Sequence, residues 1–305
     1  GILFMLFSFC YLYFLQGEIL AEAQFVYSRG ITSYDMLLGA IITTMVLQIV
    51  QWVVATASGL PSRWHALSYL PSMLILAILT NVSKEVLVDF TLGKWVWIAP
   101  SVLLFYVLFV FGARKFCDGY SIYASDLKSQ TYPNYIILFI LMLITGSVPR
   151  TPDVYYYELK TERLILEKDY AAAVEVGKKS LRTTPRLTQL RMYALERQGL
   201  LAERLFDYPQ HDGSQGLLNV ADTFFYNRIS SQEICAFLGA YCGKNVKTAS
   251  QYYQLVFADS LWNRHTVDYY LCSLLLDRKL KEFYDKLLLY YNLSDTVAGA
   301  YENLP

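Results

Sequence analysis

The segment Tyr132–Asp153 reads YPNYIILFILMLITGSVPRTPD and separates two parts of the chain that differ in character. It holds the last long apolar run, over residues 135–144, and it ends in the stiff exit Pro149-Arg150-Thr151-Pro152. Long apolar stretches precede it, and shorter helical patterns follow it. The sequence therefore predicts an all-α protein with a transmembrane helical domain over residues 1–149 and a soluble helical domain over residues 150–305.

Charge is distributed unevenly between these two parts. The chain has 305 residues, of which 55% are apolar and 17% are charged, and its net charge is zero. Soluble domains contain about 25% charged residues. Residues 1–150 hold 8 Lys/Arg and 7 Asp/Glu, which leaves 18 and 19 for the rest. The first half therefore suits a lipid bilayer, and the balanced charge argues against a nucleic-acid partner, which needs a basic face.

Five apolar stretches approach the length of about 20 residues that a membrane-spanning helix needs. No Asp, Glu, Lys or Arg lies in the middle of any of them, which argues against an ion channel or proton-coupled pump. Gln48 and Gln51 share one helical face and predict an interhelical hydrogen bond, with a substrate path as the alternative. The sequence predicts a polytopic bundle of about five spans, near Gly1–Gln16, Met36–Ala57, Leu67–Val82, Trp95–Ala113 and Tyr135–Val148.

The loops between these stretches indicate an orientation. Two loops on one side, Ser58–Ala66 and Arg114–Pro133, hold four Lys/Arg, and the two on the other, Gly17–Asp35 and Ser83–Lys94, hold three. Cytoplasmic loops carry the excess of Lys and Arg. We therefore expect a multi-pass protein of the bacterial inner membrane whose C-terminal domain is extracytoplasmic, an orientation that one additional or missing span would invert.

The ends of the chain and its cysteines support two further expectations. The chain starts inside an apolar run and ends as a new helical pattern begins, so we expect a piece of a longer protein with a truncated C-terminal domain. Five cysteines are present, with no CxxC pair. Cys235 and Cys242 are seven residues apart, about 10 Å along a continuous helix, which is too far for a disulfide. We expect free thiols.

After Pro152, apolar residues recur at helical spacing and strand signals are weak. Residues Pro209–Leu217 are rich in turn formers and predict a break between helical pairs. Arg278-Lys279-Leu280 resembles Lys168-Asp169-Tyr170 as a turn between helices. The predicted helices are Val154–Leu166, Tyr170–Thr183, Arg186–Gln198, Leu200–Tyr208, Leu218–Tyr226, Ser231–Tyr241, Val246–Ser260, Arg264–Leu276, Leu280–Tyr291 and the start of one over Leu293–Leu304.

One helical pair resembles a tetratricopeptide repeat (TPR). The segment Lys168–Val174, followed by Ser180 and Pro185, is similar to the second half of that repeat, with Ala173 and Ser180 at its two small-residue positions. Tyr157 stands at its first aromatic position. The pattern is incomplete, because Lys160, Thr161 and Gly177 replace its leucine, glycine and large aromatic, and the following unit matches less well. The resemblance implies stacked helical hairpins whose concave face binds a peptide or a partner helix.

Tyrosines are the candidate partner-binding residues of this domain. Tyr155, Tyr252 and Tyr269 belong to runs of adjacent tyrosines that can line such a face. The competing interpretation is that each pair places one ring in the core and one at the surface. Both remain open at this point.

Signatures of catalysis are missing from the sequence. It has no phosphate-binding loop, no HExxH and no GxSxG, and it indicates no metal site and no cofactor. His265 is expected in an ordinary turn. The loop after the first span contains Glu18, Glu22, Arg29 and Asp35. Multi-span glycosyltransferases that use lipid-linked sugar donors place an acidic residue in such a loop, where it acts as a base or holds a metal. An ordinary polar loop is the alternative.

We therefore expect a membrane-anchored scaffold whose repeat module binds another protein, and the sequence favours a non-enzyme without deciding it. The chain as a whole resembles uncharacterised multi-span bacterial membrane proteins with repeat-like tails. The alternative function is a glycosyltransferase-like membrane enzyme acting on a lipid-linked envelope substrate.

Overall fold

The structure is a computed structural model that describes residues 1–82, 93–117, 127–147, 152–220, 228–242 and 246–291. Contacts divide the chain into two compact units, Gly1–Pro152 and Asp153–Pro305. Helices make up both units, and the described residues include no strand. The all-α class predicted from the sequence is thus confirmed.

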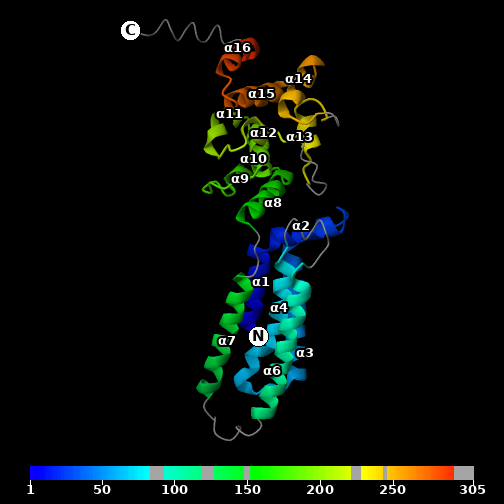
Figure 1. Ribbon diagram of the computed structural model, residues 1–305, viewed down its shortest axis with the longest axis vertical. Helices are drawn as coiled ribbons and strands as arrows, with labels where there is room; N and C mark the ends of the chain where they lie inside the picture. Colours follow the sequence, from blue (N-terminus) through cyan, green and yellow to red (C-terminus); the bar gives the residue numbers. More distant parts are fainter. Residues whose placement is uncertain (83–92, 118–126, 148–151, 221–227, 243–245, 292–305) are drawn as a thin grey trace, which may run out of the picture. The chain divides into compact units, whose positions relative to one another are not determined.

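The N-terminal unit is a bundle of apolar helices (Figure 1). Its elements are α1 (Ile2–Cys10, continued by a π-helical turn over Tyr11–Leu15), α2 (Gly17–Tyr27), α3 (Met36–Ser58), a 3₁₀ helix (Ser62–Tyr69), α4 (Leu70–Thr80), α6 (Trp95–Cys117) and α7 (Leu127–Ser147). Helix α3 packs on α1 and α4, and α4 packs on α7. Helix α2 is bent by 70° from the α1 segment.

Local signals begin and end the longest helix of this unit. The Asp35 side chain accepts a hydrogen bond from Leu38 N at 2.9 Å and so caps the start of α3. Gly59 follows its last residue with φ 54°, a left-handed conformation that glycine adopts without strain. The apolar run between these two residues therefore forms one uninterrupted helix of 23 residues.

Polar side chains, some buried and some half-buried, join the helices of this bundle. Gln48 donates to Gln51 at 2.7 Å, and Gln51 donates to Ser68 of the 3₁₀ helix at 2.9 Å. The predicted hydrogen bond between packed segments is therefore present. Asn134 of α7 donates to Ser62 O and accepts from Ala66 N, both at 2.7 Å. These bonds matter because an apolar surround offers a polar group no water as an alternative partner.

Fewer helices qualify as membrane spans than the sequence suggested. In the described part, Met36–Ser58 and Trp95–Ala113 are long and apolar enough to cross a bilayer, and the bent pair Ile2–Leu15 plus Gly17–Tyr27 adds a third if it counts as one span. The apolar helices Trp64–Thr80 and Thr131–Ser147 are shorter. Two or three candidate spans are compatible with a membrane protein.

The C-terminal unit consists of shorter helices, several of which contact their neighbours along the chain. They are α8 (Asp153–Leu166), α9 (Tyr170–Glu175), α10 (Pro185–Arg197), α11 (Leu201–Arg204), a 3₁₀ turn (Leu205–Asp207), α12 (Gly213–Leu217), α13 (Ser231–Phe237), α14 (Ala249–Ala258), α15 (Arg264–Leu276) and α16 (Leu280–Tyr291). Side chains cap most of the helix starts. The capping residues are Asp169, Thr184, Ser230, Thr248 and Asn263.

The core of this unit is formed by apolar side chains from α8 to α15. Leu190 and Leu195 of α10, Tyr252 and Val256 of α14, and Tyr269 of α15 are completely buried in one cluster. Helices α8, α9 and α10 contact one another, and α15 contacts α16. Burial of these faces supplies most of the stability of helices that are too short to persist alone.

Two turns in this unit adopt the same conformation. Lys168, between α8 and α9, has φ 63°, and Arg278, between α15 and α16, has φ 59°. These are the two turns whose sequences resemble each other. The similarity of the sequences is therefore matched by a left-handed residue at the same place in each turn.

The helix predicted over Tyr170–Thr183 is much shorter in the structure. Helix α9 ends at Glu175, because Val176 is extended and Gly177 is left-handed with φ 60°. Gly177 also leaves room for the Tyr157 ring, since a Cβ at that position would lie 2.7 Å from the ring. The predicted break over Pro209–Leu217 contains the short helix α12. The helices predicted over 218–226 and 293–304 fall largely or wholly outside the described residues.

The expectation about Cys235 and Cys242 is wrong. Helix α13 ends at Phe237, and the chain turns back through Gly239 at φ 119°. The two Cα atoms are therefore 5.9 Å apart, within the range that a disulfide spans, and the sulfurs are bonded. The Tyr252 hydroxyl fixes the same turn, because it donates to Cys235 O at 2.7 Å and lies 3.1 Å from Ala240 O.

Candidate functional site

The four polar residues predicted near the first span do not form one cluster with a shared role. Asp35 is used as the cap of α3. Arg29 follows α2 in a left-handed conformation and is exposed. Glu18 and Glu22 lie one turn apart on α2, and both are buried. The structure thus pairs the two glutamates on one helical face and gives Asp35 a structural function.

A cavity of about 350 Å³ lies beside the same helix in the N-terminal unit. It is formed by α2, the start of α3, the end of α4 and the first residue of α6. Its lining residues are uncharged and largely apolar or aromatic: Leu20, Ala23, Gln24, Tyr27, Tyr34, Thr43, Ile78, Leu79, Asn81, Val82 and Trp95. Neither Glu18 nor Glu22 lines it.

A second cavity, of about 270 Å³, lies in the C-terminal unit and is called here the α14–α16 cleft. It is lined by residues of α14, α15 and α16, by the turn between α15 and α16, and by Ser214 of α12. Aromatic rings and polar side chains share its wall. The lining residues are Ser214, Ser250, Tyr253, Gln254, Phe257, Tyr270, Ser273, Leu274, Asp277, Lys279, Glu282, Lys286 and Tyr290.

The aromatic residues of the cleft form a connected group. The Phe257 ring lies 5.0 Å from the Tyr270 ring and 5.5 Å from the Tyr290 ring, centroid to centroid. Tyr253 lies 5.4 Å from Tyr270 on the other side. Such separations are typical of packed aromatic pairs, which hold one another in place at little entropic cost. The wall of the cleft is therefore preformed.

Two carboxylates of the cleft are already engaged as acceptors. The Tyr270 hydroxyl donates to Glu282 at 2.8 Å, and the Ser214 amide donates to Asp277 at 3.2 Å. Desolvation and the neighbouring Glu282 raise the pKa of Tyr270, so its hydroxyl stays protonated at neutral pH. Among the described residues, Lys279 and Lys286 line the cleft and form no ion pair with either carboxylate, so both ammonium groups remain available to a ligand.

The tyrosines singled out from the sequence do not line this cleft. Tyr252 and Tyr269 are completely buried, and Tyr155 is buried as well. Their sequence neighbours Tyr253 and Tyr270 line the cleft. The alternation of core and surface within a tyrosine pair is therefore seen at residues 269 and 270. Sequence alone offers no signal for which member of a pair faces outward, because both are tyrosine.

A carboxyl–imidazole pair that the sequence did not reveal joins α10 to α15. The Nδ1 atom of His265 lies 2.6 Å from a carboxylate oxygen of Glu196, which is almost completely buried. Burial, and next the charge of Asp268, raises the pKa of Glu196 to about 8, and burial lowers the pKa of His265. Both shifts favour the uncharged pair, a protonated Glu196 carboxyl beside a neutral His265 ring. The two residues are 69 positions apart in the sequence, so no local sequence pattern predicts their contact.

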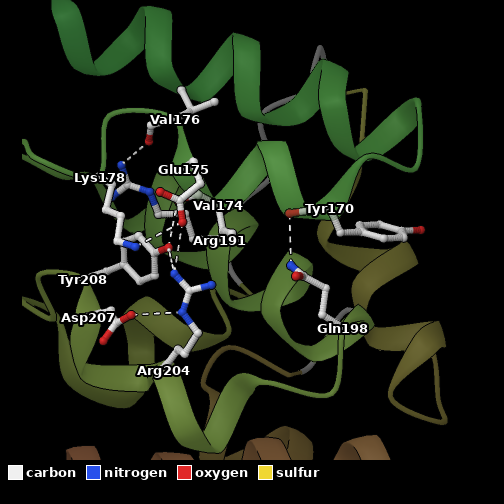
Figure 2. Close-up of polar contacts among 10 residues, drawn as sticks. All are labelled: Tyr170, Val174, Glu175, Val176, Lys178, Arg191, Gln198, Arg204, Asp207 and Tyr208. Atoms are coloured by element: carbon white, nitrogen blue, oxygen red, sulfur yellow. Dashed lines mark hydrogen bonds and ion pairs between the residues drawn. The ribbon is translucent and has the colours of Figure 1, made fainter.

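The break at the end of α9 is stabilised by a polar cluster (Figure 2). The buried guanidinium of Arg191 donates to Val176 O at 2.8 Å, and the Tyr208 hydroxyl donates to Val174 O at 2.8 Å. These donors satisfy carbonyl groups that a longer helix would have used itself. The Arg191 guanidinium also stacks on the Tyr208 ring at 5.1 Å.

At the surface of this cluster, Glu175 accepts hydrogen bonds from Lys178 at 3.1 Å and from Arg204 at 3.2 Å (Figure 2). The bond from Lys178, then that from Arg204, lowers the pKa of Glu175. Arg204 also donates to Asp207 at 3.0 Å. The charges of the cluster are thus largely matched within it, which favours a structural role.

In the described part of the chain, no group of three or more His, Cys, Asp or Glu side chains can hold a metal ion.

Comparison with known proteins identifies a family. Neither a curated protein nor a solved structure matches the sequence. Residues 85–242, slightly more than half of the chain, match the model of a family of unknown function, DUF6057. This match covers α6 and α7 of the first unit and ends at Cys242 in the second unit. The chain therefore belongs to the family of unknown function DUF6057.

Proposed function

We propose that this chain is a membrane-anchored binding protein whose C-terminal unit holds a segment of a protein partner in the α14–α16 cleft. The observation that carries the proposal is the combination of a preformed aromatic wall with the available ammonium groups of Lys279 and Lys286. Pockets of this composition bind by burying an apolar group and orienting it with a few polar contacts. The cleft is also uncommitted, since none of its residues forms a metal site or a recognised catalytic group.

Anchoring rests on the helices of the N-terminal unit. The two long apolar helices α3 and α6 expose their side chains, including Trp97, Phe105 and Phe111, in a way that soluble proteins avoid. We propose that the bent α1–α2 pair and the shorter apolar helices Trp64–Thr80 and Thr131–Ser147 complete a bundle of about five spans. A short helix crosses a bilayer when it is packed among longer ones.

The binding unit is proposed to be a diverged array of TPR-like hairpins. The matched left-handed turns at Lys168 and Arg278 support this, as do the contacts between α8 and α9 and between α15 and α16. In such arrays, neighbouring hairpins create a continuous groove that binds extended or helical segments. The α14–α16 cleft is the part of this unit where aromatic side chains line such a groove.

A photo-reactive amino acid at Gln254 tests the binding proposal directly. Gln254 lines the cleft, so irradiation of membranes containing the full chain is expected to join it to the partner. The exposed residue Arg182, placed identically, serves as the control site and is expected to give no adduct. The measurement is the irradiation-dependent adduct, whose cross-linked peptides are then sequenced to identify the bound segment.

Two tyrosine variants make that test specific. Tyr270→Ala removes a ring from the cleft wall and is expected to reduce the adduct at Gln254 at least tenfold, which is a loss of about 1.4 kcal/mol. Tyr284→Ala removes an exposed ring from α16 outside the cleft and is expected to leave the adduct unchanged. Equal yields at Gln254 and Arg182, or equal effects of both tyrosine variants, would refute the proposal.

We further propose that the C-terminal unit lies on the extracytoplasmic side. Two independent observations support this: the excess of Lys and Arg in the loops assigned to the cytoplasm, and the Cys235–Cys242 disulfide. Structural disulfides form and persist in oxidising compartments such as the periplasm and are rare in the cytoplasm.

Thiol labelling decides the side. In a chain whose own cysteines are replaced by Ala, Arg182→Cys is expected to react with a membrane-impermeant maleimide in intact cells. Ser62→Cys, in a loop of the opposite side, is expected to react only after lysis. The reverse pattern would place the C-terminal unit in the cytoplasm.

The alternative hypothesis, a membrane enzyme acting on a lipid-linked envelope substrate, remains a prediction. Its candidate carboxylates Glu18 and Glu22 are paired on α2, but they do not line the neighbouring cavity. No observation in the described residues favours it over binding.

A further inference from the structure

We infer that the cavity between α2, α3, α4 and α6 binds the hydrocarbon chain of a bilayer lipid. This site is distinct from the α14–α16 cleft, although the inference rests on the membrane anchoring proposed above. The cavity volume of about 350 Å³ is within the range of about 300–1,000 Å³ that ligand pockets occupy.

The lining favours an uncharged, apolar ligand. Leu20, Ala23, Ile78 and Leu79 supply aliphatic surface, and no lining residue carries a charge. The amide of Gln24 already donates to Thr32 at 3.1 Å. Cavities with an apolar lining bind water weakly and take up apolar molecules instead. A hydrocarbon chain gains about 0.8 kcal/mol for each methylene that it buries.

The geometry of α2 separates this cavity from the acidic residues. Leu20, Ala23, Gln24 and Tyr27 recur at the spacing of one helical face, and all of them line the cavity. At 100° per residue, Glu18 and Glu22 fall on the opposite face of the helix. A charged or hydrolysable group in the cavity would therefore not contact either carboxylate. The lining thus fits binding of a lipid chain rather than catalysis of a reaction on it.

The cavity opens toward the outside of the bundle. Its lining residues Tyr27 and Leu79 are 51% and 39% exposed. Leu79 lies one turn from Ile75, which is also exposed, so both belong to the outward apolar face of α4. A chain in the bilayer can therefore enter sideways from that face. Tyr27, Tyr34 and Trp95 also line the cavity, and such aromatic residues are typical of the membrane interface.

A lipid with a photoreactive diazirine in its acyl chain tests the inference. Membranes containing the full chain are irradiated with a diazirine phospholipid, and the labelled peptides are identified by mass spectrometry. We expect label on Leu20–Tyr27 and Ile78–Val82. Label on the exposed α3 residues Val46, Ile49 and Val53 is the internal reference for contact with the bilayer.

Three variants provide the controls. Ala23→Phe and Thr43→Phe each place a ring in the cavity and are expected to reduce the cavity label at least fivefold without changing the reference label. Ile42→Phe adds the same ring beside Thr43 on an exposed position and is expected to leave both labels unchanged. Two filling variants on different helices are used so that misfolding of one, seen as loss of monodispersity in detergent, leaves the other interpretable.

Competition distinguishes the possible sources of the chain. A tenfold excess of unlabelled phospholipid or of a polyprenyl phosphate is added, and the one that lowers the ratio of cavity label to reference label identifies the lipid class. Reference label without cavity label, or cavity label that neither competitor nor the filling variants reduce, would overturn the inference. Loss of the reference label itself would instead refute membrane anchoring, so the two failures are distinguishable.

Discussion

Glu162→Ala is expected to lower the free energy of unfolding of the C-terminal unit by about 3–5 kcal/mol. Glu162 forms a buried ion pair with Arg186 at 2.7 Å, and the same carboxylate oxygen accepts the Ile229 amide at 2.9 Å. Arg186 also donates to Ile229 O. Loss of the carboxylate leaves a desolvated guanidinium and an amide without their acceptor, and such groups destabilise a fold more than the pair stabilised it.

Pulse proteolysis of the full chain across a urea series measures this change. Glu167→Ala is the matched control, because Glu167 pairs with Arg163 at 2.8 Å on the surface, where an i, i+4 pair contributes about 0.3–0.5 kcal/mol. The double variant Glu162→Leu/Arg186→Met is expected to recover part of the loss. Recovery stays incomplete because the N–H and C=O groups of Ile229 lose both partners. Similar effects of Glu162→Ala and Glu167→Ala would contradict the assignment.

Gly177→Ala is expected to destabilise the C-terminal unit by about 2–5 kcal/mol. Two costs combine at this position. A left-handed conformation costs a non-glycine residue about 1–2 kcal/mol, and the new methyl group would lie 2.7 Å from the Tyr157 ring, so packing must shift at a further cost of about 1–3 kcal/mol. Gly199→Ala is the matched control, because Gly199 is also left-handed but has no atom within 4 Å of the added Cβ.

The difference between these two glycine variants isolates the clash with Tyr157. The same proteolysis assay applies, and Tyr157→Leu is expected to bring the effect of Gly177→Ala close to that of Gly199→Ala. If both glycine variants destabilise equally in the natural background, the approach of the Tyr157 ring to Gly177 is not a determinant of the break after α9.

Helix boundaries in the C-terminal unit could be predicted from the sequence where local signals decide them. The predicted helices over residues 264–276 and 280–291 coincide with α15 and α16. Asn263 caps the first, and the turn before the second contains left-handed Arg278. These signals act over a few residues and are visible in the sequence itself.

The boundaries that were predicted wrongly depend on distant residues. Helix α9 ends early because Arg191 and Tyr208 take the carbonyl groups of Val176 and Val174. Helix α13 ends before Cys242 because Tyr252 bonds across the turn and brings Cys242 back to Cys235. A periodicity argument extends a helix until a breaker appears, and it cannot include such tertiary partners.

The candidate sites also differ in whether local sequence or distant packing determines them. The composition of the first half indicated lipid contact, and the tyrosine runs pointed to the helices that form the α14–α16 cleft. Which ring of a pair faces outward depends on the packing of the unit, and so do the Glu196–His265 pair and the cavity beside α2. The candidate role of Asp35 was inferred from residue type alone, whereas the structure uses its carboxylate as a helix cap.

The side-chain caps of the C-terminal unit have a consequence for how relatives of this chain can vary. Five helices from α9 to α15 begin at a residue whose own side chain fixes the first turn, so the start of each helix is encoded beside it rather than by the length of the preceding loop. An insertion between two helices then leaves the residue pattern within each helix unchanged. Lengthening a surface loop also adds only a small entropic cost of closing that loop on folding. We therefore expect relatives of this chain to differ in loop length more than in the spacing of residues within each helix.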